Sequence, residues 1–96
     1  MDNVRLELDA NGHGKFVITD GETELGEMEV TVSGGQLTAH HTNVFPAGEG
    51  KGTGKKLFAG MVGHAREHHL TVIPHCSFVH AQLKKNAEQY SDIWKG

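Results

Sequence analysis

The hydrophobic pattern of this 96-residue chain changes once, at Pro46, and that change limits the folds open to it. Before Pro46, apolar and polar residues alternate with a period of two, which is typical of half-buried β-strands. After Pro46, apolar residues recur at spacings of three and four, which is typical of an amphipathic helix. The chain is therefore expected to build a sheet first and to cover it with helices afterwards.

Four strands are predicted before Pro46, joined by tight turns. In the first, Val4, Leu6 and Leu8 alternate with charged residues. Asp20-Gly21 predicts a type I′ hairpin turn, in which both central residues have positive φ. The strands are expected at residues 4–8, 15–19, 27–32 and 36–45, with turns at Asn11-Gly12, Asp20-Gly21 and Gly34-Gly35.

In the second half of the chain, the pattern predicts a helix that ends at His68 or His69 and then a short buried strand over 71–74. A second helix is predicted over 78–86, with Ser77 as its candidate N-cap. The order ββββαβα indicates an α+β sandwich in which the last strand lies parallel to its neighbour. Residues 1–96 are expected to form a single domain.

Composition and charge exclude several classes of protein. No run approaches the roughly 18 apolar residues of a membrane helix, and the first residues lack the pattern of a secretory signal. Cys76 is the only cysteine, so no internal disulfide is possible and a cytoplasmic location is expected. The net charge of −3 argues against a dedicated nucleic-acid binder.

The charge is unevenly divided between the two halves of the chain. Residues 1–49 carry a balance of −7, and residues 50–96 carry a balance of +4. An anionic ligand would therefore favour the second half.

A glycine-rich turn between a strand and a helix predicts an anion site. The first N–H groups of a helix have no partner inside it, and glycines let the backbone approach phosphate oxygens closely. Neither the nucleotide P-loop nor the dinucleotide motif fits the glycines, which alternate at positions 48, 50, 52 and 54. The alternative is a flexible surface loop.

Several ordered blocks resemble the GNAT superfamily of acyl-CoA-dependent N-acyltransferases, and more narrowly its small single-domain members. In those proteins a His-Thr-Glu-Val stretch precedes the loop and a Cys-Pro-Phe-Val stretch follows the next strand. The blocks are His41-Thr42-Asn43-Val44, then Gly50-Lys51-Gly52-Thr53-Gly54 with Lys55-Lys56-Leu57, then Ala65-Arg66 and Pro74-His75-Cys76-Ser77-Phe78-Val79.

The resemblance implies an N-acetyltransferase that uses acetyl-CoA and an unidentified amine. CoA would lie between two splayed parallel strands, here residues 36–45 and 71–74. The residues implied for its binding are Val44, Gly50, Lys51, Gly52, Thr53, Gly54 and Lys55. Two positions depart from the family pattern: Glu49 is acidic where the loop usually begins with Gln or Arg, and Asn43 stands where relatives commonly have Glu.

His41 and Cys76 are the candidate catalytic residues. Adjacent residues on a regular strand face opposite sides, so only one of His40 and His41 would face the CoA cleft, and the resemblance selects His41 as the proton acceptor. Cys76 precedes the last helix, whose N-terminus would favour a thiolate, and it could protonate the leaving CoA or carry the acyl group. The alternative for Cys76 is an inert buried thiol.

Two other function classes stay open. A non-catalytic acyl-CoA-binding module would keep the cleft without the chemistry. A metal-binding protein is suggested by eight histidines and by His64-Ala65-Arg66-Glu67-His68, which fits a His-x-x-Glu-His pattern. A solvated helix face explains that pattern more simply, and no metal is expected.

Overall fold

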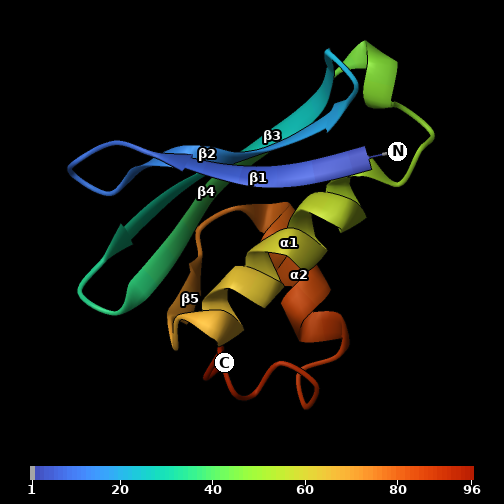
Figure 1. Ribbon diagram of the computed structural model, residues 1–96. Helices are drawn as coiled ribbons and strands as arrows, with labels where there is room; N and C mark the ends of the chain where they lie inside the picture. The colour runs from blue at the N-terminus through green and yellow to red at the C-terminus, as the bar shows by residue number, and fades with distance from the viewer. Residues whose placement is uncertain (1) are drawn as a thin grey trace.

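The computed structural model describes residues 2–96 and contains a five-stranded sheet with two α-helices (Figure 1). The strand order is β1-β2-β3-β4-β5; the first four strands pair antiparallel, and β5 pairs parallel with β4. This confirms the predicted α+β class and the order ββββαβα. The elements are β1 (Asp2–Leu8), β2 (His13–Asp20), β3 (Thr23–Ser33), β4 (Gln36–Val44), the 3-10 helix η1 (Pro46–Gly48), α1 (Thr53–Glu67), β5 (Thr71–Pro74) and α2 (Ser77–Lys85).

Both α-helices lie against the same face of the sheet (Figure 1). α1 buries Leu57, Met61 and Ala65 against the strands, and α2 adds Val79 and Leu83 to the same core. We call the opposite side of β1–β4 the open face, because α1 and α2 do not cover it. The hydrophobic core therefore sits on one side of the sheet, and polar side chains of the strands gather on the other.

The hairpin at Asp20-Gly21 is not the predicted type I′ turn. Asp20 is the last residue of β2 and pairs with Thr23, so the two-residue loop is Gly21-Glu22, and of these only Gly21 has a positive φ, of 62°. Glycine at the first central position is the requirement of a type II′ turn. The two positive φ values of a type I′ turn occur instead at Gly34-Gly35, with φ of 58° and 77°.

α1 ends slightly earlier than predicted, because His69 adopts a left-handed conformation with φ of 55°. The N–H of Leu70 donates to Ala65 O (2.8 Å) and that of His69 to Arg66 O (3.4 Å), which is the Schellman pattern of helix termination. His68 holds the C-cap position. Neither helix within residues 2–96 is long and apolar enough to cross a membrane.

β4 contains one extra residue relative to β3. Val30 lies opposite Ala39, whereas the preceding Glu29 lies opposite His41, so His40 is the additional residue of a β-bulge. The bulge reverses the alternation of side chains along the rest of β4. Beyond it, Thr42 turns toward the helices, where a regular strand would have placed His41.

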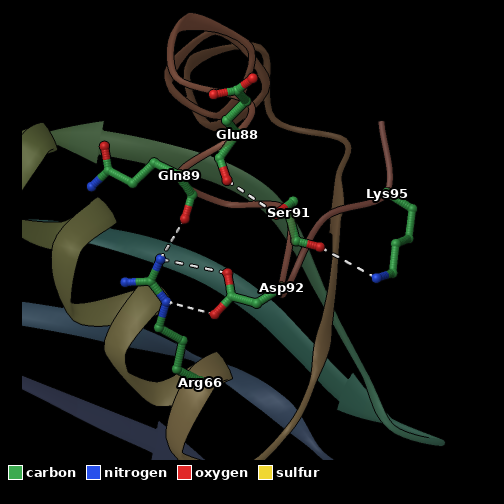
Figure 2. A network of polar contacts seen from close by, with 6 residues as sticks. All are labelled: Arg66, Glu88, Gln89, Ser91, Asp92 and Lys95. Atoms are coloured by element: carbon green, nitrogen blue, oxygen red, sulfur yellow. Dashed lines mark hydrogen bonds and ion pairs between the residues drawn. The ribbon is translucent and has the colours of Figure 1, made fainter.

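The segment after α2 is fastened to α1 by Arg66 (Figure 2). Its Nε donates to Asp92 Oδ2 (2.9 Å) and its terminal N–H group to Gln89 O (2.8 Å). The Arg66 guanidinium keeps the pKa of Asp92 below its usual value. Ile93 O then accepts a hydrogen bond from the N–H of Val72 (2.7 Å), so the tail covers the outer edge of β5.

The pH dependence of stability is expected to include a contribution from His64. Its ring meets Phe16 edge-on at 5.8 Å and lies 4.3 Å from the ring of His68. Burial, and then the charge of His68, lower the pKa of His64 below its ordinary value of 6.5. His64 therefore binds a proton less readily in the folded state than in the unfolded state. Its contribution to the free energy of unfolding is complete above about pH 6.5, the pKa of the unfolded state. The contribution is lost as the pH falls from there toward the lower pKa of the folded state.

His64→Gln should therefore reduce the loss in free energy of unfolding between about pH 7.5 and about pH 5.5, measured by urea denaturation. His41→Gln, at an exposed position, should retain the loss of the parent. An unchanged loss in the His64 variant would show that its burial does not oppose protonation.

Candidate functional site

β4 and β5 separate halfway along β4 and leave a gap between them. Their parallel pairing ends at Ala39 opposite Pro74, and one further hydrogen bond follows, from the N–H of Cys76 to Ala39 O (2.8 Å). β4 continues to Val44, whereas the chain beyond β5 turns into α2. We call this opening the β4–β5 gap. It occurs between the two strands that the family resemblance selects.

The backbone of β4 presents polar groups to the gap. The N–H of Phe45 donates to Leu25 O of β3 (2.9 Å). Because the direction of backbone groups alternates along a strand, the N–H and C=O groups of Val44 and Thr42 point to the opposite edge, into the gap. The side chain of Val44 is 42% exposed. An extended amide chain could therefore add to β4 here as a further strand would.

The glycine loop leads from the end of β4 into α1. Gly50 and Gly52 have positive φ values of 75° and 70°, and Gly52 occupies the N-cap position of α1 in a left-handed conformation. No side chain caps this helix. The N–H of Lys56 donates to Gly52 O (3.0 Å), so the N–H groups of the preceding turn have no acceptor within the helix.

The loop fits an anion such as a pyrophosphate. Gly50 and Gly52 are exposed at the positive end of the helix dipole, and so are Lys51 and Lys55. The hydroxyl of Thr53 is buried and donates to Gly48 O (2.7 Å), so only its N–H remains for a ligand. The packing of α1 against α2 also favours glycine at position 54, because a Cβ there would lie 3.1 Å from the Phe78 ring.

Cys76 lies at the closed end of the β4–β5 gap. Its side chain is buried with 7% exposed, and its Sγ lies 3.4 Å from Thr42 Oγ1. Cys76, not Ser77 as predicted, holds the N-cap position of α2, because its extended backbone (φ −75°, ψ 124°) places Ser77 in the first turn. Thr42 was missed at the sequence level because regular alternation assigns it to the open face.

The prediction that His40 and His41 face opposite sides of the sheet is wrong. His40 Nε2 lies 2.8 Å from the hydroxyl of Thr31, which also contacts His13 on the open face. His41 lies opposite Glu29 and is exposed on the same face. The bulge at His40 is the physical reason, because two successive residues of the bulged strand oppose a single partner.

Asn43, one of the two positions that depart from the family pattern, also lies on the open face. Its amide Nδ2 donates to Glu27 Oε2 (3.3 Å), and Glu27 in turn accepts from Lys15 Nζ (3.2 Å). Asn43 thus supplies a hydrogen-bond donor to a carboxylate on the neighbouring strand.

The histidines of α1 do not form a metal site with a third side chain in the described part of the chain. Within residues 2–96, no three His, Cys, Asp or Glu side chains converge closely enough to hold a metal ion. His64 and His68 stack on one another, and His64 also packs on Phe16.

Comparison with known proteins gives a matching family model and a solved structure of similar fold. A family model described as "GCN5-related N-acetyl-transferase" matches residues 15–93. The chain belongs to this family. The α+β fold is shared with the NMR solution structure of a "GCN5-like putative N-acetyltransferase" from Staphylococcus aureus, with a TM-score of 0.67 and 35% identity over 98% of this chain and 90% of that one. No curated protein matches the sequence. Acetyl transfer is thus the general reaction class that this family supports.

The accessibility of Cys76 can be tested directly. Because the thiol is buried, iodoacetamide should alkylate it at least about tenfold more slowly in the folded protein than in urea, measured by mass spectrometry. If the gap binds acetyl-CoA, a saturating concentration should slow alkylation further.

A matched control moves the thiol by one residue. In the variant Cys76→Ser with Ser77→Cys, the thiol occupies an exposed position and should react at nearly the unfolded rate. Equal rates for Cys76 in the folded and unfolded chain would contradict its burial in the gap.

Proposed function

We propose that this chain transfers an acetyl group from acetyl-CoA to an amine. The observation that carries the proposal is the β4–β5 gap, which opens directly beside an uncapped helix N-terminus. Acetyl-CoA has a pyrophosphate and an amide-containing arm that ends in the thioester. The loop offers N–H groups for the first, and the edge of β4 offers backbone groups for the second.

Each candidate residue has a defined part in donor binding. The N–H groups of Gly50, Gly52, Thr53, Gly54 and Lys55 hold the pyrophosphate, while Lys51 and Lys55 add positive charge. The backbone of Val44 hydrogen-bonds to the amide-containing arm. Glu49 is exposed, so water and salt screen its repulsion of the phosphates.

The chemistry follows from bringing the amine to the thioester in the gap. The neutral amine nitrogen bonds to the thioester carbonyl carbon, the C–S bond breaks, and the proton lost by the amine replaces the one taken up by the CoA sulfur. Most of the rate enhancement comes from this positioning. His41 accepts the amine proton through water on the open face, and Cys76 donates a proton to the leaving sulfur at the closed end of the gap.

Donor binding is tested by two matched glycine variants. Gly52 and Gly21 both have positive φ, and at both the space that a side chain would enter is open, so Val causes comparable backbone strain at each. Gly52→Val should weaken acetyl-CoA binding at least about tenfold by calorimetry, because a side chain there obstructs the phosphates. Gly21→Val should bind like the parent; equal weakening in both would move the site away from the loop.

Transfer is tested with the parent and a His41 variant. Incubation with acetyl-CoA and a panel of amines should give a product about 42 Da heavier than its amine, as expected for acetylation, by mass spectrometry. His41→Ala should lower the transfer rate by about 10²-fold with little change in acetyl-CoA affinity. A parent that binds acetyl-CoA but acetylates no amine would be a non-catalytic binding module instead.

A further inference from the structure

A groove of about 720 Å³ crosses the open face, away from the glycine loop. It extends from the turn between β1 and β2, across β3, to the bulge in β4. Its size is within the range of pockets that hold small ligands. The side chains that give it its chemistry are Glu7, Asp9, His13, Glu27, Glu29 and His40.

A hydrogen-bonded chain of side chains crosses the floor of this groove. The hydroxyl of Thr31 lies 3.1 Å from His13 Nδ1 and 2.8 Å from His40 Nε2. Because a hydroxyl has one proton, Thr31 donates to at most one imidazole and accepts an N–H from at least one of them. The chain fixes both rings and connects three neighbouring strands.

The groove ends where the β4–β5 gap begins. His40 directly follows Ala39, the last residue of β4 that pairs with β5, and its ring lies 6.2 Å from that of His75, which follows β5. A molecule bound along the groove therefore has one end beside the position at which the thioester lies in the proposed function.

The charges along the groove favour a cation. Lys15 is its one cationic residue, and Glu27 already neutralises it at 3.2 Å. The backbone N–H groups of His13 and Asn11 donate to Asp9 and lower the pKa of its carboxyl group, so Asp9 stays ionised. Glu7 already has a cationic partner, because Arg5 Nε donates to Glu7 Oε2 (2.9 Å).

The exposed Glu29 lies opposite His41, and it takes part in none of the ion pairs formed within residues 2–96. It is therefore the carboxylate best placed to meet an incoming cation without losing an existing partner. Its substitution also leaves the Lys15–Glu27 contact intact.

We propose that this groove is the acceptor site and that it takes a primary amine carried on an extended chain with at least one further positive charge. The proposal rests on the proposed function for the acetyl donor. The reacting amine lies at the His40 end, while the second charge lies among the carboxylates toward β1. Free polyamines and lysine-rich segments share this chemistry.

Binding is tested without the acetyl donor, so that the two proposals can fail separately. Spermidine and, in a second arm, a trilysine peptide are titrated into the protein and followed by NMR. Each source that binds should shift the resonances of His13, Glu29 and His40. Glu29→Gln should weaken the binding about threefold, and Glu88→Gln, an exposed control on the tail, should leave it unchanged.

Turnover gives a second readout. With the cation that binds, Glu29→Gln should raise KM for the amine about threefold with kcat and acetyl-CoA affinity nearly unchanged. The proposal is overturned if neither cation shifts the groove resonances, or if Glu29→Gln and Glu88→Gln behave alike in folded proteins. If a cation binds the groove while acetyl-CoA does not bind at all, the proposed function fails and the groove stands as a cation site.

Discussion

β4 has one more residue than the segment of β3 with which it pairs, and the resulting β-bulge decides which side chains of β4 lie on each face of the sheet. Glu29 and Val30 are consecutive, whereas their partners His41 and Ala39 are separated by His40. A sheet residue must present its side chain to one face or the other, so the extra residue reverses every assignment that follows it. Thr42 thereby reaches Cys76 on the helix side.

The same constraint places the two proposed sites, one for the acetyl donor and one for the amine, on the two sides of one strand. On the helix side, the end of β4 feeds into the glycine loop and the uncapped start of α1. On the open side, His40 and His41 lie beside the groove. The β4–β5 gap connects the two sides because β5 is only four residues long and the chain turns into α2 after it. A longer β5 would close the edge of β4 that an extended amide chain needs.

The division of charge along the sequence becomes a division in space. The acidic first half supplies the carboxylates of the open face, and the basic second half supplies the lysines around the start of α1. In the proposed function, this division of charge would attract an anionic donor to the glycine loop and a cationic acceptor to the open face.

Much of the fold follows from the local pattern of the sequence. Val4 and Leu6 of β1 pack against the core, as do Leu57, Met61 and Ala65 of α1. Burying one side of a strand or helix produces such patterns, so element type and order could be predicted. Leu8, which continues the alternation, is 41% exposed. The anion site proposed at residues 50–55 could likewise be inferred locally, because it depends on glycines at the start of a helix. The positions of the turn at Gly21 and of the N-cap at Cys76 shifted by one residue, since neighbouring residue types suit either position.

Tertiary structure decided three features of the site. These are the side of the sheet on which His41 lies, the contact between Thr42 and Cys76, and the groove on the open face. A bulge has no fixed sequence signature: whether β4 takes its extra residue at His40 depends on how Val30 and Ala39 pack beneath α1 while Glu29 and His41 stay on the open side. The sequence by itself determined which segments form strands and helices and where an anion could bind. Only the packing of the sheet against α1 and α2 determined which side chains meet, because register is a property of two paired strands and not of either one alone.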